Sequence, residues 1–354
     1  MKRTSKYVGL DVHLENTVIS VRDDSTRVIA RAIVATAAEP LVAYLRPLRG
    51  SVHVAFEEGT QAQWLYDVLR PVVDQVVVCD LRGERRRGNK GDQQDADRLS
   101  ARLQRGDLRV VYHDVGSRAT LREVARAYVT TVKERTSQML RLKAIFRARG
   151  IKTKGKDVYH PAQRDAWLAQ LREPGVHFRT SLLYALLDAV TPLGRDAKSR
   201  LVAEARRDPA YKRVRKIPGF GPIRTALLLA VLMSPWRFHT KRSLWAFAGL
   251  AVVTHTSAEF TTREGQPVRR ARAPRTRGLN RNHHPLIKHL FKSAAVAAIR
   301  KTGPVQDRYT AYLAAGLRPE LAQVNIARKL AATVLHVWKT GEAFDATKLT
   351  TLAT

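Results

Sequence analysis

The first 110 residues alternate between two hydrophobic patterns, and this alternation constrains the fold more than any other feature of the chain. Apolar or β-branched runs typical of strands occur at 7–12, 17–22, 27–34, 51–56 and 75–78. Helical spacing of apolar residues predicts helices at 38–48, 61–69 and 93–105. Three early strands followed by alternating helices and strands predict a mixed sheet with helices on its faces.

Residues 117–150 have the pattern of one long helix. A heptad repeat laid on it has as its core positions Leu121, Ala125, Tyr128, Val132, Arg135, Met139, Leu142 and Phe146. Because all but Arg135 are apolar, the pattern predicts a coiled coil or a helical hairpin. A return helix is expected to begin within 181–190, after a polar connection. The alternative is an ordinary amphipathic helix packed on its own domain.

The rest of the chain, from about residue 210, is mostly helical in pattern. The predicted fold class is therefore α/β plus all-α. We expect a sheet-containing domain over 1–110, a helical coiled-coil or linker segment over 111–205, and a helical domain over 206–354. The stretch 262–282 is rich in Arg, Gly and Pro, and we expect a loop there that becomes ordered on a partner.

The charge of the chain indicates a polyanionic partner. Lys and Arg number 63 against 31 Asp and Glu, which gives a net charge of +32 and a pI near 11.0. Such an excess is typical of nucleic-acid-binding proteins. The most basic stretches are 81–91 and 263–292. The residues in them that we expect to contact nucleic acid are Arg82, Arg85, Arg86, Arg87, Lys90, Arg269, Arg270, Arg272, Arg275, Arg277 and Arg281.

Other compositional features narrow the class of protein. No apolar run of membrane-spanning length occurs, so no membrane partner is expected. Cys79 is the only cysteine, which excludes an intrachain disulfide and a cysteine-based zinc site. We therefore expect a cytoplasmic, nucleoid-associated protein.

Four acidic positions are candidates for a metal site. Asp11 ends the first predicted strand, and Glu57 or Glu58 ends a later one. Asp92 and Asp95 lie three residues apart at the start of a helix, so they face the same side. Strand ends and a helix start can bring carboxylate oxygens together around hard divalent cations, which catalyse phosphoryl transfer. Asp97 lies off that face and is expected to be a solvated residue.

The segment 217–226, IPGFGPIRTA, has a helix-hairpin-helix pattern. Gly219 and Gly221 allow a tight turn with close backbone approach. The helix that follows, with Arg224 and Thr225 near its start, presents free N–H groups to a phosphate. We expect these four residues to grip nucleic-acid backbone without reading sequence. The alternative is a tight helix–helix turn with only a packing role.

Hydroxyl side chains cluster after Gly249 and Leu250, at Thr254, Thr256 and Ser257. A hydroxyl can act as a nucleophile when a neighbouring group activates it. From the residues alone, Ser257 is one more loop serine.

Together these motifs resemble a DEDD-type insertion-sequence transposase, the group that includes Piv-like DNA invertases. The resemblance spans about residues 7–345. It rests on the segments YVGLDVH, FEEGTQAQWLYDVL, NKGDQQDA, IPGFGPIRTA, RFHTKRSLWAFAGL, THTSAEF and the tail GLRPELAQVNIARKLAATVLHVWKTGEAFD.

The resemblance implies a RuvC-like, RNase H-type domain followed by a helical domain with a catalytic serine. It implies that Asp11, Glu57, Asp92 and Asp95 bind Mg²⁺ or Mn²⁺, and that Ser257 attacks phosphorus to form a covalent phosphoserine intermediate. Gly59-Thr60 stands where relatives often have Thr-Gly, which leaves Glu58 as an alternative to Glu57. Val252 and Ala258 also depart from the family pattern around the serine.

The partners implied by the resemblance are donor DNA, target DNA and a non-coding guide RNA that bridges them. It also implies a homo-oligomer, a dimer or tetramer, in which the acids of one subunit meet the serine of another. Two other functions remain open from the residues. One is a RuvC-like structure-specific endonuclease that uses only the four acids, and the other is a non-catalytic architectural nucleic-acid-binding protein.

Overall fold

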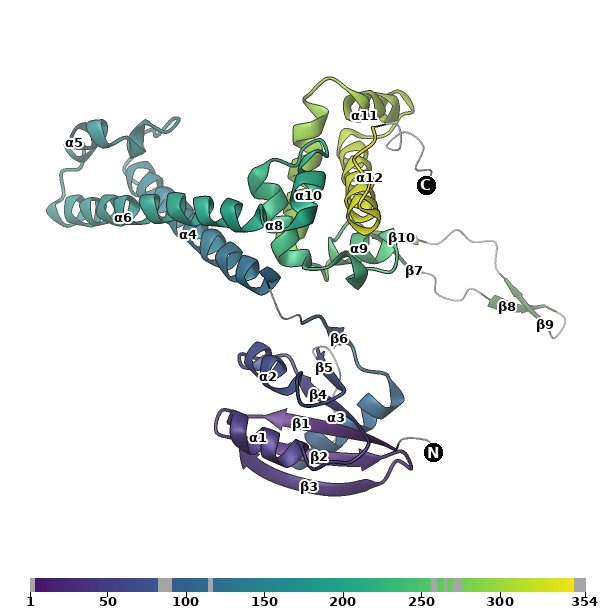
Figure 1. Ribbon diagram of the computed structural model, residues 1–354. Coiled ribbons are helices and arrows are strands. Elements are labelled where there is room, and N and C mark those ends of the chain that lie inside the picture. The colour runs from purple at the N-terminus through teal and green to yellow at the C-terminus, as the bar shows by residue number, and fades with distance from the viewer. Residues whose placement is uncertain are drawn as a thin grey trace. The chain divides into compact units, whose positions relative to one another are not determined.

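The computed structural model describes residues 4–81, 91–113, 117–255, 260–263, 266–269 and 275–346 (Figure 1). Contacts within the chain separate two compact units, Met1–Val115 and Gly116–Thr354. The first contains the main sheet and the second is mostly helical.

The first unit is built on a mixed sheet, as predicted, and the sheet has six strands. Its strand order is β3-β2-β1-β4-β5-β6. The strands are β1 (Ser5–Val12), β2 (Asn16–Asp23), β3 (Val28–Ala35), β4 (Ser51–Glu57), β5 (Gln75–Cys79) and β6 (Val110–Val111). Strands β1, β2 and β3 pair antiparallel, β1, β4 and β5 pair parallel, and β6 runs antiparallel to β5.

Helices cover both faces of this sheet. The α1 (Ala38–Leu45) and α2 (Ala62–Leu69) helices pack on the face that carries Val8 and Leu10 of β1, in one apolar cluster. The α3 helix (Asp92–Arg105) packs on the opposite face, which carries Gly9. Because side chains alternate along a strand, the face that α3 covers is also the face of Asp11.

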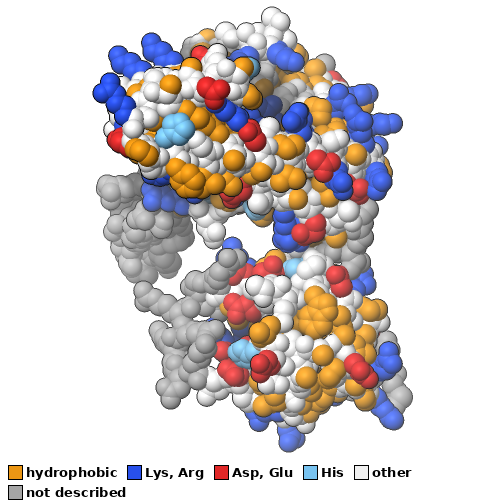
Figure 2. All heavy atoms as spheres, turned by 90° about the vertical axis from the view of Figure 1, so that its left-hand side faces the viewer, with side chains coloured by type: hydrophobic (Ala, Val, Ile, Leu, Met, Phe, Trp, Pro, Cys, Tyr) orange, Lys and Arg blue, Asp and Glu red, His pale blue; other side chains and the backbone are white. Residues whose placement is uncertain are grey.

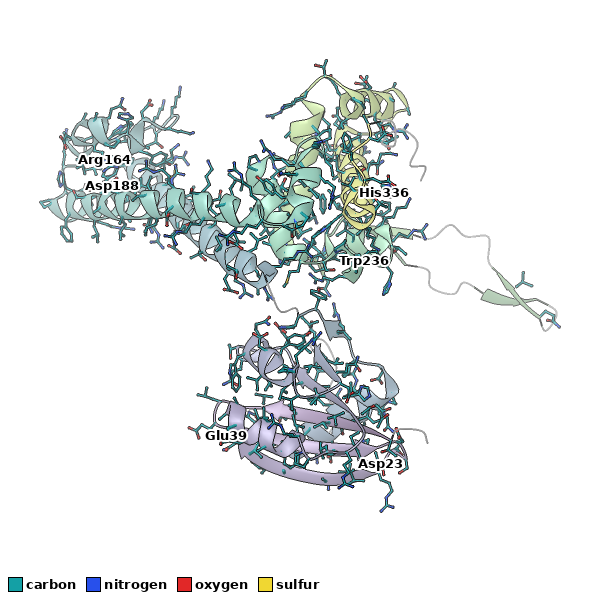
Figure 3. The ribbon with its side chains drawn as sticks, in the orientation of Figure 1. Asp23, Glu39, Arg164, Asp188, Trp236 and His336 are labelled. Atoms are coloured by element: carbon teal, nitrogen blue, oxygen red, sulfur yellow. The ribbon has the colours of Figure 1, made fainter. Side chains whose placement is uncertain are left out.

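The second unit begins with a helical hairpin. The α4 helix (Ser117–Arg147) packs along α6 (Pro174–Ala205), with α5 (Arg164–Leu168) in the connection. Arg164 of α5 pairs with Asp188 of α6, with Nη2 and Oδ1 2.6 Å apart (Figure 3). The return helix was expected to begin within 181–190, but it begins earlier, at Pro174.

The heptad positions on α4 are buried only toward its two ends. Leu121, Ala125, Leu142 and Phe146 are buried, whereas Val132 is 41% exposed. Leu121 and Ala125 belong to the same core as buried residues of the C-terminal helices. One end of the hairpin therefore shares the core of the C-terminal helices, whereas Leu142 and Phe146 belong to a separate cluster with Leu183 and Tyr184 of α6. The supercoil of a coiled coil stays a prediction.

The remaining helices of this unit surround that core. They are α7 (Pro209–Arg215), α8 (Pro222–Leu232), α9 (Lys241–Phe247), α10 (Pro285–Ile299), α11 (Pro304–Ala314) and α12 (Pro319–Thr340). None of the helices in the described ranges is long and apolar enough to cross a membrane.

Four short strands lie in and before the loop expected at 262–282. They are β7 (Val252–His255), β8 (Phe260–Arg263), β9 (Gln266–Arg269) and β10 (Arg275–Leu279), with β7 paired to β10 and β8 to β9. The expectation of a loop was wrong for β9, β10 and the last two residues of β8, whereas β7 lies before that segment. The arginine-rich composition hid the β-branched Thr261, Thr262 and Val268, which favour strands.

The positive charge is concentrated in the helical unit. Residues 1–115 contain 18 Lys and Arg against 16 Asp and Glu, whereas residues 116–354 contain 45 against 15. On the face drawn in Figure 2, Lys and Arg side chains are spread over the helical unit and acidic side chains gather on the sheet-containing unit. The helical unit therefore carries the excess charge that favours a polyanionic ligand, whereas the charges of the sheet-containing unit nearly balance.

Candidate metal and catalytic site

Asp11 at the end of β1 lies at the edge of the sheet, beside Glu57 at the end of β4. Strands β1 and β4 run parallel, with Leu10 opposite Phe56, so Asp11 and Glu57 are the next residues on neighbouring strands. Leu10 and Phe56 are buried in the cluster beneath α1 and α2. Because side chains alternate, Asp11 and Glu57 leave the sheet on the other face, toward α3.

The start of α3 contributes the other two acids. Asp92 is the first residue of the helix and Asp95 follows one turn later. This helix lies unusually close to β1, because a Cβ added to Gly9 would lie 2.2 Å from the carbonyl oxygen of Ala96. The absent side chain at Gly9 therefore lets the first turn of α3 approach the end of β1.

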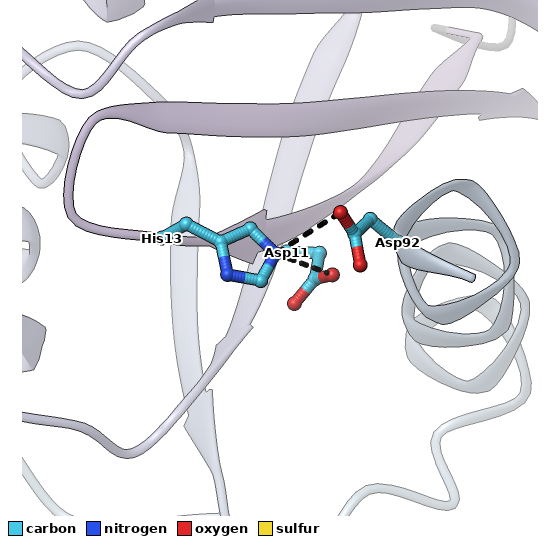
Figure 4. A group of neighbouring side chains, drawn as sticks. All are labelled: Asp11, His13 and Asp92. Atoms are coloured by element: carbon cyan, nitrogen blue, oxygen red, sulfur yellow. Dashed lines mark hydrogen bonds and ion pairs between the residues drawn. The ribbon is translucent and has the colours of Figure 1, made fainter. Parts of the chain in front are cut away.

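Asp11, Asp92 and His13 converge at this point (Figure 4). The Nε2 atom of His13 lies 3.2 Å from Oδ2 of Asp11 and 3.6 Å from Oδ2 of Asp92. One ligand atom from each of the three residues lies within 4.8 Å of the others, so the group could hold a metal ion.

The electrostatics of the group favour a cation. Burial raises the pKa of Asp11 above its ordinary value, and the nearby charges of Asp95 and Asp92 raise it further, while His13 opposes the shift. Asp95 lies one turn along α3 from Asp92, on the same side of the helix. A bound cation would relieve the repulsion among the carboxylates.

His13 was not among the predicted site residues. A signal was available, because His13 follows Asp11 by two residues and so lies on the same side of the extended chain. The acidic pattern alone does not reveal it, because histidine is not one of the carboxylates that define that pattern.

Glu57 and Glu58 have different surroundings. The Oε2 atom of Glu58 lies 2.6 Å from Nε2 of His113, which is buried, and Nδ1 of His113 lies 3.0 Å from Oε1 of Gln63. Glu57 is exposed at the end of β4. These surroundings favour Glu57 as the acid that is free to face a metal.

Asp97 is not the solvated residue that was expected. It accepts hydrogen bonds from Ser20 Oγ at 2.5 Å and from Arg31 Nη2 at 2.8 Å. Burial alone would raise its pKa, but the hydrogen bonds from Arg31 and Ser20 outweigh this and hold the pKa of Asp97 below its ordinary value. The expectation failed because the face of α3 that turns away from Asp95 points to β2 and β3. Asp97 therefore ties α3 to the sheet.

The turn between α7 and α8 is fixed by packing on α10. Gly219 has φ +83°, and a Cβ there would lie 2.1 Å from the carbonyl oxygen of Ala294. Arg224 donates from Nη1 to the Gly219 carbonyl and from Nε to Ser293 Oγ, both at 3.0 Å. Arg224 thus holds the turn on α10.

Thr225 cannot make the contact that was expected of it. Its side chain is fully buried, and its backbone N–H donates to the carbonyl of Gly221 at 3.0 Å. As the fourth residue of α8, it lies past the free N–H groups of the first turn.

The other predicted site residues are only partly described. Arg281 is exposed after β10, and side chains are not described for Arg269, Arg275 and Arg277 in β9 and β10. The predicted residues outside the described ranges are Ser257, Arg82, Arg85, Arg86, Arg87, Lys90, Arg270 and Arg272.

Comparison with known protein families identifies the class. A family model for DEDD transposases of the IS110 type, described as a transposase, matches residues 8–148, which include Asp11, Glu57, Asp92 and Asp95. A second model, described as the transposase IS116/IS110/IS902 family, matches residues 211–311. No curated protein matches the chain significantly. The chain is a transposase, an enzyme class that cuts and rejoins DNA. It belongs to the DEDD-type insertion-sequence transposases, as the sequence motifs indicated.

Proposed function

We propose that this transposase cuts and rejoins DNA with a divalent metal held by Asp11, Glu57, Asp92 and Asp95. The observation that carries this proposal is the convergence of Asp11, Asp92 and His13 at the start of α3, within the segment matched by the DEDD model. Carboxylate oxygens suit Mg²⁺ and Mn²⁺, so the donor set fits these ions. When bound, the metal would neutralise charge on the scissile phosphate.

The chain's own residues would then position the reactants. The three aspartates lie on rigid elements, since α3 is tied to the sheet through Asp97 and Arg31. His13 would hold the Asp11 carboxylate in place with an Nε2–H hydrogen bond, and its Nε2 also lies 3.6 Å from Oδ2 of Asp92. The strongly basic helical unit would bind the nucleic acids.

Ser257 is proposed as the nucleophile, on the strength of the family resemblance. Its Oγ would attack phosphorus while its proton passes to a base. A P–O(Ser) bond forms, a P–O bond of the strand breaks, and the departing oxygen takes up a proton. A hydroxyl of a second strand would then displace the serine, so the bond energy is conserved without ATP.

The proposed partners are donor DNA, target DNA, a non-coding guide RNA and further copies of this chain. One feature of α6 supports the homo-oligomer. Phe178, Leu182, Leu186 and Leu193 are exposed by 71%, 52%, 41% and 58%, and their spacing places them along one side of the helix. Such an apolar stripe is typical of a helix that packs on another chain.

A plasmid recombination assay with the native flanking DNA tests the mechanism. Asp11→Ala and Ser257→Ala should each abolish recombination, while Glu39→Ala, an exposed acid on α1 (Figure 3), should not. A covalent protein–DNA adduct should form with wild type and disappear with Ser257→Ala.

Two outcomes would favour the other functions. If Ser257→Ala still cleaves and wild type never forms an adduct, the protein is a nuclease that uses the acids alone. If Asp11→Asn changes neither cleavage nor recombination, an architectural role remains.

A further inference from the structure

A cavity of about 580 Å³ lies beside the turn between α7 and α8. Two stretches far apart in the sequence line it, one around Gly219 and Gly221 and the other around Lys301 and Gly303. The second stretch joins α10 to α11 and is not part of the predicted hairpin.

The cavity is lined by cations and lacks acids. Arg215, Lys216, Arg224 and Lys301 line it, and none of its lining residues in the described part of the chain is Asp, Glu, Asn or Gln. Arg224 is already bound to Gly219 and Ser293. The exposed Arg215, Lys216 and Lys301 therefore remain to meet a ligand.

Two helix N-termini border the same cavity. The α8 helix begins with Gly221-Pro222 and α11 with Gly303-Pro304, and neither N-cap has a side-chain hydrogen bond among the described residues. The first backbone N–H groups of a helix lack helical acceptors, and they carry the positive end of the helix dipole. The proline at the first position of each helix has no N–H, so the donors are those of the residues after it. They lie where the cations gather, an arrangement that favours phosphate.

The shape of the cavity is set by close packing. Gly219 sits against the backbone of Ala294 in α10, and Ala297 and Ala298 of the same helix line the cavity with small side chains. The turn and the cavity therefore share one rigid support.

We propose that this cavity binds phosphate groups of a nucleic-acid backbone, and that Lys301 with the 302–304 turn forms a second half of the site. This inference rests on the proposed function, because it takes a nucleic acid as the partner. It adds Arg215, Lys216, Lys301 and the start of α11 to the site. Backbone contacts of this kind position a nucleic acid without reading its sequence.

The test measures binding of full-length protein to a labelled DNA duplex of unrelated sequence over a range of salt concentrations. Lys301→Ala should weaken binding about 3- to 10-fold and make the slope of log K against log salt shallower by about one. Arg215→Ala and Lys216→Ala should act similarly. Lys198→Ala, an exposed cation on α6, is the matched control.

An unchanged salt slope in all three cavity variants, or an effect confined to one base sequence, would overturn the inference. The same measurement with an RNA duplex shows whether the cavity binds the phosphates of DNA, of RNA or of both. Equal losses on both duplexes support a shared backbone site, and loss on one assigns the site to that nucleic acid. Asp11→Ala should bind with the wild-type slope, so failure of recombination and failure of this site are distinguishable.

Discussion

A Cβ on Gly9 would lie 2.2 Å from the carbonyl oxygen of Ala96 and 2.5 Å from the backbone nitrogen of Ser100. The backbones of β1 and α3 therefore touch two residues before Asp11. This contact sets how near Asp92 and Asp95 come to Asp11, so the proposed metal site depends on a residue without a side chain.

Gly9→Ala should push α3 away from β1, because backbone atoms cannot move aside as a flexible side chain does. We expect a loss of about 1–3 kcal/mol in the free energy of unfolding and loss of metal-dependent cleavage. Urea unfolding and a cleavage assay measure the two effects. Gly175→Ala, where a Cβ meets nothing within 4 Å, is the control. Wild-type stability and cleavage in Gly9→Ala would contradict this account.

Asp97→Asn should loosen α3 from the sheet, because Asp97 accepts hydrogen bonds from both Ser20 and Arg31. The charged hydrogen bonds predict a loss of about 1–3 kcal/mol, reduced by partial solvent exposure. A double-mutant cycle with Arg31→Ala should show coupling between the two sites. Asp196→Asn breaks an exposed pair with Arg200 and should change stability by less than about 1 kcal/mol. Purely additive effects of the two substitutions would argue against a direct contact of Asp97 with Arg31 that holds α3 on the sheet.

Divalent metal should stabilise the folded protein through the acids. A ligand at a hundred times its dissociation constant adds about 2.7 kcal/mol to the free energy of unfolding. Mg²⁺ or Mn²⁺ should therefore raise the melting temperature of wild type, and chelation should reverse the rise. Asp11→Asn and Asp92→Asn should lose this response, while Glu39→Gln should keep it. An equal metal response in all four proteins would place the ion elsewhere.

Glu57→Gln should mainly reduce cleavage, and Glu58→Gln should mainly reduce stability. Glu57 is exposed, so its loss should reduce metal-dependent cleavage with little change in stability. Glu58 meets the buried His113 at 2.6 Å, so Glu58→Gln should lower stability by about 1–3 kcal/mol. Thermal unfolding and cleavage rates measured side by side separate the two. The reverse pattern would make Glu58 the metal ligand.

The stability of the helical unit should depend on pH through His284. Burial lowers the pKa of His284 below its ordinary value of 6.5, and Arg237 and His283 lower it further. As the pH falls below about 6.5, the unfolded chain takes up a proton that the folded chain resists. Stability should therefore fall with acidification and be fully present above this pH. Urea unfolding between pH 7.5 and 5.5 should show a weaker dependence in His284→Gln than in wild type or His239→Gln.

Much of the first unit could be predicted from local patterns. Strands β1 to β5 and helices α1 to α3 follow hydrophobic periods of two or 3.6 residues, which are visible in short windows. Asp11, Asp92 and Asp95 could be proposed because they stand at the ends of those elements. The two-residue strand β6 was missed, because it is too short to show a period.

What could not be predicted depends on pairs distant in the sequence. Arg31 and Asp97 are 66 residues apart, and no local pattern connects them. The burial of Thr225 and the role of Arg224 in holding the turn likewise depend on α10. The cavity at Lys301 was missed for the same reason, since its two halves come from separate connections.

The order of the elements along the chain determines when the proposed metal site can form during synthesis. Asp11 lies in the first strand to be synthesised, but its partners Asp92 and Asp95 lie in the last helix of that unit. A nascent chain that has made β1, β2 and β3 already displays an aspartate, yet it cannot assemble the cluster until α3 has emerged and packed over Gly9. On the proposed mechanism, cleavage therefore requires α3 to have packed on the sheet, and fragments that end before α3 should not cleave DNA.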